Sequence, residues 1–340
     1  MAWIGRCLLA PVHLLVLCTI LGFISVLGWP LELFAHLKVQ YAVLLAIALP
    51  FLCFLKYSRV NRFTQIASAL ALIANVVAVA TCCLSPMLAH ENRPSHEIAI
   101  LQFNVNSANT NYAAFDQLVQ VRHPDLICLE EISSGWKEHL QSLKSDYPYQ
   151  VIRARSDNFG VALLSKFKVD NVELLPLGEA AVPTIWAKID WPALATKNGV
   201  TRDASAGKEK DENLHLQLIV THPVPPVSGD YTRMRDQQLN LLAAKIAESH
   251  CMPMIVAGDL NCTPWSYPFK DFIHGAGLMD SRLNLGIETT WPAAIWPLRM
   301  PLDHVLNTPD LDCKQREVEA DCGSDHLPVF VRFAASRSGQ

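Results

Sequence analysis

The chain has 340 residues, of which 51% are hydrophobic, and its formal net charge is −4 at pH 7. This length admits one large domain together with a membrane segment, and the mean hydropathy of +0.19 is high for a purely water-soluble protein. The net charge excludes a uniformly basic protein that binds nucleic acid over its whole surface.

Three apolar stretches dominate the N-terminal part, at roughly 7–29, 39–55 and 66–87. Each approaches the ~20 residues that cross the core of a bilayer as a helix. Buried core helices seldom run this long without a charge. A signal peptide explains only the first stretch, which lacks a clear cleavage site. We therefore predict an N-terminal membrane region at 1–87 with about three transmembrane helices, of which the second is the shortest.

Charged residues predict the orientation of these helices. Arg6 precedes the first stretch, and Lys56, Arg59 and Arg62 lie between the second and the third. Positively charged loops stay in the cytoplasm, so the chain leaves the third span on the outer side. We expect an integral protein of a bacterial inner membrane whose following domain faces the periplasm. Two spans instead of three place that domain in the cytoplasm.

The ten cysteines leave the redox compartment open. Half of them lie in the apolar stretches, where cysteine behaves as a small hydrophobic residue, and no zinc-site spacing is present. Cys313 and Cys322 flank a short polar turn. They form a disulfide in an oxidising compartment or remain free thiols, and the sequence does not decide between the two.

A polar linker at 88–97 is followed by one mixed α/β domain at 98–335. Helical spacing predicts helices at 113–123, at 136–144 on the surface, and at 232–250. Apolar runs predict strands at 98–105, 125–132, 149–154, 160–166, 214–222 and 252–261. The polar segment 194–213 is typical of a surface loop. This order indicates a layered α/β domain with packed sheets.

Polar side chains follow the apolar strands in five places. They are Asn104 and Asn106, Glu130 and Glu131, His222, Asp259 and Asn261, and finally Asp303, Asp325 and His326. Turn preference explains any one of them, but five coincident strand ends favour a catalytic site positioned by the sheets. Oxygen ligands suit Mg²⁺, Mn²⁺ or Ca²⁺. Such a metal with histidine and carboxylate groups is suited to hydrolysis of a phosphate ester.

Five blocks in this order, FNVN, LICLEEI, THP, GDLN and SDH, resemble the endonuclease/exonuclease/phosphatase superfamily. That superfamily includes DNase I-like nucleases, neutral sphingomyelinases and inositol polyphosphate 5-phosphatases. The resemblance covers about 97–335. It implies a four-layer α/β sandwich, with two packed β-sheets flanked by helices, and a phosphoesterase that uses Mg²⁺ or Mn²⁺.

The resemblance also implies a metal-binding side of the site. Glu131 would ligate the metal, and Asn104 would orient that ligand or bind the metal through water. Asp325 would assist the metal. The chain departs from the family pattern where Glu130 replaces a glutamine and where Asn106 replaces an acid found in some members. Glu130 and Glu131 compete for the ligand role, and we favour Glu131 because neighbouring strand residues point to opposite faces.

The remaining motif residues would act on the phosphate and the attacking water. His222 would contact the phosphate, and Asn261 would hold it. Asp259 would position or deprotonate the water. Asp303 would orient His326, which would act on the phosphate or carry a proton. The division of labour between Asp259 and His326 stays open.

Other residues in the sequence are assigned less specific roles. Arg235 and Gln238 are expected to have structural roles. Asn158 either contacts the substrate or has no part in binding it. The aromatic residues Tyr231, Trp265, Trp291 and Trp296 stack on a base, shape a lipid groove, or belong to the core. His13 and His36 are expected at the membrane interface.

The substrate is a phosphate ester, either nucleic acid or a phospholipid headgroup. The net acidic domain disfavours tight binding of a DNA duplex, and a membrane anchor favours a lipid. The alternative function is a catalytically silent, membrane-anchored binding module with the same fold. A transporter is disfavoured because the apolar stretches offer no pathway of ionisable residues.

Overall fold

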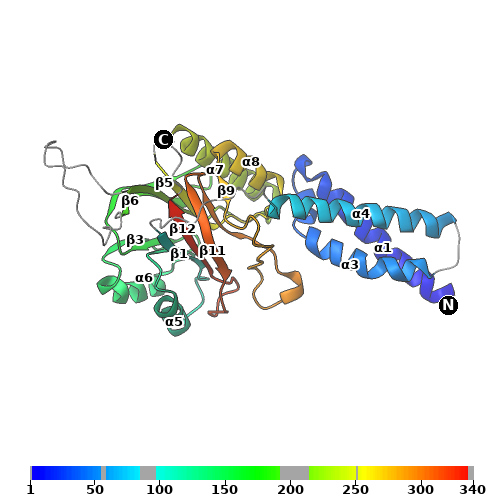
Figure 1. Ribbon diagram of the computed structural model, residues 1–340, viewed down its shortest axis with the longest axis horizontal. Coiled ribbons are helices and arrows are strands. Elements are labelled where there is room, and N and C mark those ends of the chain that lie inside the picture. Colours follow the sequence, from blue (N-terminus) through cyan, green and yellow to red (C-terminus); the bar gives the residue numbers. More distant parts are fainter. Residues whose placement is uncertain (1, 55–58, 85–96, 192–213, 250–251, 336–340) are drawn as a thin grey trace, which may run out of the picture.

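The computed structural model describes residues 2–54, 59–84, 97–191, 214–249 and 252–335. The predicted linker before Glu97 and the predicted loop at 194–213 lie almost entirely outside the described residues. Figure 1 shows a layered α/β body from one end of which the N-terminal helices project.

The helices and strands follow one another along the chain. The helices are α1 (Ala2–Phe23), α2 (Leu31–Ala35), α3 (Lys38–Cys53), α4 (Arg59–Cys83), α5 (Tyr112–Arg122), α6 (Ser134–Leu140), α7 (Gly229–Glu248) and α8 (Tyr267–Ala276), with short 3-10 turns η1 (Ser25–Leu27), η2 (Gln141–Ser145) and η3 (Trp296–Leu298). The strands are β1 (Glu97–Asn104), β2 (Leu126–Glu130), β3 (Tyr149–Arg153), β4 (Val161–Ser165), β5 (Val169–Pro176), β6 (Pro183–Trp191), β7 (Leu214–Thr221), β8 (Met254–Asp259), β9 (Met279–Asp280), β10 (Asp303–Asn307), β11 (Leu311–Val318) and β12 (Val329–Ala335).

The strands form two six-stranded sheets, ordered β11-β12-β1-β2-β4-β3 and β5-β6-β7-β8-β10-β9. Their inner faces pack together through a core of aliphatic residues from both sheets, such as Ile100, Leu218 and Val305. Helices α7 and α8 cover the outer face of the second sheet, and α5 and α6 cover that of the first. The predicted sandwich of two packed sheets with flanking helices is confirmed.

Two details of the domain differ from the sequence prediction. Helix α6 is not a purely surface helix, because Trp136 and Leu140 are buried under it. The Trp136 ring meets Phe115 of α5 edge-on, with ring centroids 5.4 Å apart. Helix α8 was not predicted; it buries Phe269, Phe272 and Ala276.

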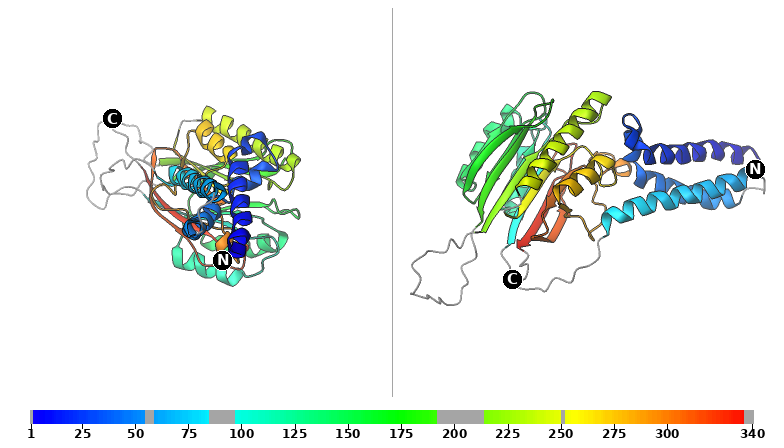
Figure 2. Two further views of the ribbon diagram at one scale, coloured as in Figure 1. Left: turned by 90° about the vertical axis from the view of Figure 1, so that its right-hand side faces the viewer. Right: turned by 90° about the horizontal axis from the view of Figure 1, so that it is seen from above.

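The N-terminal helices α1, α3 and α4 lie side by side, as two views in Figure 2 show. Among the described residues one helical stretch, Asn61–Cys83, is long and apolar enough to cross a membrane, with 23 residues and a mean hydropathy of 2.2. The other two apolar helices, Leu9–Phe23 and Lys38–Cys53, are shorter. Three helices thus occur at the three apolar stretches, and the number that span a bilayer stays a prediction.

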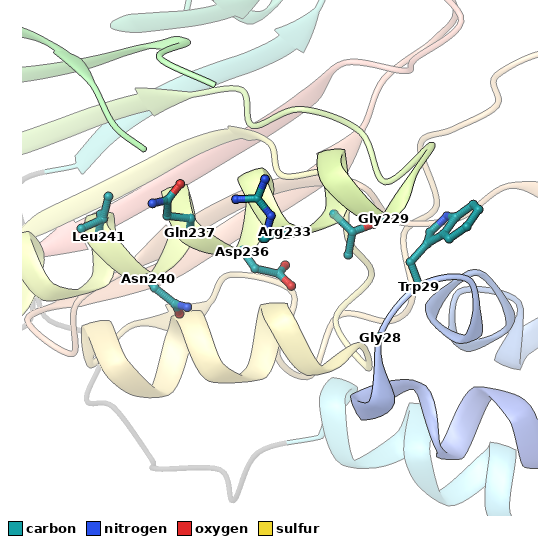
Figure 3. Close-up of a pocket in the computed structure, with 9 residues that line it drawn as sticks. Gly28, Trp29, Gly229, Arg233, Asp236, Gln237, Asn240 and Leu241 are labelled. Atoms are coloured by element: carbon teal, nitrogen blue, oxygen red, sulfur yellow. The ribbon is translucent and has the colours of Figure 1, made fainter. Parts of the chain in front are cut away.

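Specific contacts dock the N-terminal region onto the sandwich. The indole Nε1 of Trp265 donates to the carbonyl oxygen of Ala35 over 2.8 Å. The guanidinium of Arg235 on α7 pairs with the Glu32 carboxylate of α2 over 2.8 Å, and both side chains are buried. Helix α2 therefore lies against the sandwich. Figure 3 shows the outer side of this junction, where Trp29 faces the N-terminal end of α7.

Candidate active site

The sheet topology brings the polar strand ends together. Strands β1 and β2 are parallel, with Asn104 opposite Glu130. Strands β7 and β8 are also parallel, and β10 runs antiparallel to β8 with Asp303 opposite Asp259. Because parallel strands end at the same edge, the two sheets present these groups at one end of the sandwich.

The backbone at this edge depends on a glycine. Gly258 has φ = 153°, a conformation that L side chains rarely adopt. A Cβ at this position would lie 1.9 Å from the carbonyl oxygen of Thr221 on β7. The glycine of the GDLN block therefore lets β8 approach β7 closely and fixes the position of Asp259, the next residue.

A cavity of about 750 Å³ opens over these strand ends. Six of the residues predicted for the site line it: Glu131, His222, Asp259, Asn261, Asp325 and His326. Asn104 and Asp303 lie one step behind the wall, where each is fully buried and hydrogen-bonded to a lining residue. All eight predicted site residues thus gather in one place.

Asp259 lies between two imidazoles. Its Oδ2 atom is 3.5 Å from Nε2 of His222 and 3.5 Å from Nε2 of His326. Its Oδ1 accepts a hydrogen bond from the backbone N–H of Asn261 over 2.9 Å. Burial raises the pKa of this carboxyl group, but the two imidazoles and the backbone donor outweigh burial and lower it below its usual value. The arrangement holds a carboxylate at the floor of the cavity.

Asp303 and His326, a pair that the resemblance implies, are hydrogen-bonded to each other. Oδ2 of Asp303 is 2.8 Å from His326 Nδ1, so Nε2 of the same ring is turned toward Asp259. Burial lowers the pKa of His326, but the Asp303 and Asp259 carboxylates outweigh it and raise the pKa to about 10. The second oxygen of Asp303 accepts from Gln102 Nε2 over 3.0 Å, a residue that the sequence analysis did not single out.

The two adjacent glutamates have different environments. Glu130 ends β2 inside the sandwich, fully buried, and accepts from Gln102 Nε2 over 2.8 Å. Burial, reinforced by the Asp303 carboxylate, raises the pKa of Glu130 well above its usual value. Glu131 lies just past the strand with φ = 60°, a left-handed conformation that turns its side chain to the cavity. Glu131, the glutamate favoured by the sequence analysis, is therefore the one that faces the cavity. The left-handed turn after β2 directs its side chain there, not the alternation of side chains along the strand.

The carboxylates on the cavity wall fit a divalent cation. Glu131 accepts from Asn104 Nδ2 over 3.1 Å and from the Ser107 N–H over 3.3 Å. Asp325, exposed at the rim, accepts from Asn106 Nδ2 over 2.7 Å and from Trp291 Nε1 over 3.1 Å. No lysine or arginine pairs with either carboxylate among the described residues. Such sites suit Mg²⁺, which is bound by one or two carboxylates together with water and substrate phosphate.

The details of this cluster refine the metal-site prediction. No group of three or more His, Cys, Asp or Glu side chains with metal-site geometry occurs in the described part of the chain. Asn104 donates to both Glu131 and Asp259 and accepts from the Asn106 N–H through Oδ1. Its amide therefore positions the carboxylates.

Of the remaining residues named in the sequence analysis, some lie at the cavity and others are buried elsewhere in the fold. Asn261 donates from Nδ2 to the Pro223 carbonyl oxygen over 2.9 Å. Asn158, Tyr231 and Trp291 line the cavity. Trp265 is buried at the junction instead.

Two residues expected to serve structure do so. Arg235 and Gln238 are fully buried on α7. Gln238 donates to the hydroxyl groups of Thr184 and Thr221, on the neighbouring strands β6 and β7. Cys313 and Cys322 are free thiols.

Three lining residues come from the N-terminal region: Leu33 and Leu37, which the sequence analysis did not single out, and His36, which it expected at the membrane interface. His36 is only 7% exposed, and its Nδ1 is 3.2 Å from Thr263 Oγ1. Burial, together with Arg235 and Lys38, lowers the pKa of His36 to about 3. No local motif marks these residues, because they reach the site only through docking of α2.

The cavity at one end of the two-sheet sandwich is floored by carboxylates and imidazoles, groups that can take part in hydrolysis of a phosphate ester. A sequence profile of the Endonuclease/Exonuclease/phosphatase family matches residues 101–326, and the chain belongs to that family. Members of the family generally depend on a divalent metal ion. A search of curated proteins by sequence finds no match.

Solved structures of the same fold share little sequence with the chain. An endonuclease/exonuclease/phosphatase from Bacteroides vulgatus is 17% identical with a TM-score of 0.54, covering 70% of this chain and 99% of that one. D. rerio TDP2 complexed with single-strand DNA product is 16% identical with a TM-score of 0.52, covering 70% and 99%. The human Nocturnin catalytic domain with bound sulfate is 16% identical with a TM-score of 0.51, covering 71% and 96%.

Proposed function

We propose that the protein is a membrane-anchored, divalent-metal-dependent phosphodiesterase that hydrolyses its substrate by attack of water on phosphorus. The observation that carries this proposal is the cluster at the cavity floor, where Asp259 lies 3.5 Å from the imidazoles of both His222 and His326. The carboxylates of Glu131 and Asp325 lie on the wall of the same cavity. Acid–base groups and cation ligands thus face one substrate volume.

The geometry suggests a role for each side chain. Asp259 orients the attacking water, whose proton passes to the cluster of Asp259 and His326 as the new phosphorus–oxygen bond forms. His222 and Asn261 bind the phosphate oxygens, and the ester bond breaks with its electron pair on the leaving oxygen, which then takes up a proton. Asp303 keeps the His326 ring oriented. A bound Mg²⁺ or Mn²⁺, held by Glu131 with Asp325, supplies Lewis-acid stabilisation of the phosphate charge.

The side chains of the N-terminal bundle support membrane anchoring. Leucine and isoleucine side chains such as Leu17, Ile47 and Leu70 face outward. Polar side chains face inward, and Asn75 Nδ2 donates to Thr19 Oγ1 over 2.9 Å between two helices. An apolar exterior with polar contacts between helices is typical of helices in a bilayer.

We further propose that the protein is of a bacterial inner-membrane type, with the catalytic domain facing the periplasm. The N-terminal ends of α1 and α4 and the C-terminal end of α3 lie at the end of the bundle far from the sandwich (Figure 1), which agrees with the charge-based orientation. A C-terminal fusion to a phosphatase that is active only in the periplasm tests this placement. An inactive fusion that is nevertheless expressed would place the domain in the cytoplasm.

Hydrolysis of bis-p-nitrophenyl phosphate by the full-length protein in detergent tests the catalytic proposal. We expect turnover with Mg²⁺ or Mn²⁺, loss of turnover with EDTA, and loss in Asp259→Ala and His326→Ala. A folded protein without metal-dependent turnover on this or any phosphodiester would instead support a catalytically silent binding module.

A further inference from the structure

The catalytic cavity has two chemically distinct walls. Its floor is formed by the carboxylates and imidazoles described above. Much of the rest is apolar and comes from three separate segments, represented by Leu33 and Leu37, by Pro225 and Val227, and by Met300. Apolar side chains next to a phosphate-binding floor fit a ligand that is itself amphiphilic.

One of these apolar segments belongs to the N-terminal region and is held in place firmly. Glu32 of α2 forms a buried ion pair with Arg235, and the same Arg235 donates from NH1 to the carbonyl oxygen of Asn261 over 3.2 Å. The Ala35 carbonyl accepts from Trp265. The segment around α2 is thus connected by one side chain to a residue of the catalytic floor.

The polar lining contributed by this segment is also suited to a ligand. His36 lines the cavity. Its Nε2 makes no hydrogen bond within the part of the chain that the structure describes, and it lies 3.7 Å from Oε1 of Glu32. Buried polar atoms are normally satisfied. A group that binds at this nitrogen therefore also meets the Glu32 carboxylate.

The charge of the cavity does not suit a nucleic acid. No lysine or arginine lines it within the described ranges, whereas single-stranded nucleic acid is bound along basic grooves. A separate pocket at the junction, lined by Trp29 and Arg233, lies on the outer face of α7 (Figure 3). It carries no catalytic group and does not change this conclusion.

We propose that the segment Leu33–Leu37 of the N-terminal region is the specificity-determining wall of the active site, and that it selects a lipid-type phosphodiester bearing a long alkyl or acyl chain. The exposed apolar surface of the helix bundle begins at the same segment, so a substrate chain passes from the bilayer to this wall without crossing water. This inference rests on the proposed phosphodiesterase function and adds the substrate class.

Matched substrates test the proposal in the full-length protein in detergent. Ethyl, dodecyl and thymidine 5′-phosphate esters of p-nitrophenol share one leaving group and one absorbance readout. We expect kcat/KM for the dodecyl ester to exceed that for the ethyl ester by about tenfold or more, since burial of about two methylene groups suffices for this factor. We also expect kcat/KM for the thymidine ester to be lower than kcat/KM for the dodecyl ester.

Substituted variants distinguish an effect of the apolar cavity wall on the dodecyl-to-ethyl ratio from an effect of substrate partition into detergent micelles. Leu33→Ser and Leu37→Ser should each lower the dodecyl-to-ethyl ratio by about tenfold. Leu174→Ser on β5 is the matched control, because Leu174 is 45% exposed and Leu33 is 42% exposed, and it should leave the ratio at the wild-type value. Two test positions guard against one variant that fails to fold.

The outcomes distinguish the inference from the function beneath it. Equal kcat/KM for the ethyl and dodecyl esters, a preferred thymidine ester, or a ratio that neither wall substitution changes would overturn the inference while hydrolysis itself persists. Absence of hydrolysis of all three esters, or hydrolysis that survives in Asp259→Ala, would overturn the proposed function and the inference with it.

Discussion

The N-terminal bundle and the sandwich distribute their side chains in opposite ways. In the sandwich, aliphatic side chains such as Ile100 and Leu218 fill the space between the sheets. In the bundle, Leu70 is 62% exposed, whereas Ser68 and Asn75 are fully buried. A water-soluble fold buries apolar surface, while helices in lipid gain nothing by doing so and associate through small and polar contacts. The bundle thus exposes apolar side chains and buries polar ones, the reverse of the sandwich, as the proposed membrane anchor requires.

The N-terminal bundle and the sandwich meet at α2, which lies next to the cavity. A charged pair, Glu32 and Arg235, is buried at the junction, and removal of a buried charge from water is costly unless its partner is present. The apolar wall of the cavity begins at the same place. The junction therefore acts as part of the active site as well as a mechanical link.

The largest effect is expected in the sandwich, at the catalytic floor. Asp259→Ala should lower kcat for bis-p-nitrophenyl phosphate by at least about a thousandfold, because the water loses its orienting carboxylate. Steady-state kinetics measures this. Asp170→Ala, on β5 far from the cavity, is the control and should have wild-type kcat. A kcat within tenfold of wild type for Asp259→Ala contradicts the assigned role.

The junction is expected to show the next largest effect. Arg235→Leu leaves the Glu32 carboxylate buried without its partner and should lower the free energy of unfolding by about 3–5 kcal/mol. The double variant Glu32→Leu with Arg235→Leu should be closer to wild type, since the buried Glu32 charge is removed as well and the other carboxylate paired with Arg235, that of Asp236, is 41% exposed. Denaturant titration in detergent, followed by tryptophan fluorescence, measures both. Equal losses in the single and double variants argue against a coupled ion pair.

A charge on the outer face of the bundle tests the membrane half of the comparison directly. Leu70→Asp places a carboxylate where lipid is expected and should cost about 2.5–3.5 kcal/mol of insertion free energy. Leu174→Asp on the sandwich surface should change stability by about 0.5 kcal/mol or less. Insertion into membranes during cell-free synthesis gives the first quantity, and denaturant unfolding gives the second. If Leu70→Asp inserts as well as wild type, the bundle face does not contact lipid.

A pH dependence inside the sandwich is the smallest effect when it is expressed for each pH unit, about 1.4 kcal/mol. His304 Nε2 lies 2.8 Å from the Cys262 carbonyl oxygen, and Nδ1 lies 2.6 Å from Arg282 NH2, which fixes a neutral ring. Burial and Arg282 lower the pKa of His304 to about 3 from a usual value of 6.5. The unfolded chain thus binds a proton first as pH falls, so stability is full above about pH 6.5 and is lost toward pH 3.

This loss follows a slope of about 1.4 kcal/mol per pH unit for one such group. Unfolding free energies of wild type and His304→Gln between pH 6.5 and 4 measure it. The variant should be less stable at pH 7 but should have a shallower slope by about that amount. Parallel curves for the two proteins would mean that His304 is protonated in the fold.

Most motif residues were predictable because they lie at or just after the end of a strand whose apolar run is visible in the sequence, although Asp303 begins β10 and His326 precedes β12. Asp259 and Asn261 after β8 and His222 after β7 lie where that reasoning placed them. The raised pKa of Glu130 was not predictable, because it depends on burial between the sheets and on Asp303 from another strand. Local pattern identifies a strand end, but the surrounding charges and burial depend on distant segments.

The sequence by itself determined the layered α/β class, the five polar strand ends and the three apolar helices, because hydrophobic periodicity and motif order are local properties. Only the tertiary structure decided that Glu131 turns to the cavity through a left-handed residue, that Asn104 positions carboxylates, and that Leu33 and His36 line the site. Those features arise from contacts between segments as far apart as Glu32 and Arg235. No local pattern of residues encodes such a contact, since it forms only when the packed sheets and the docked helices fix both partners in space.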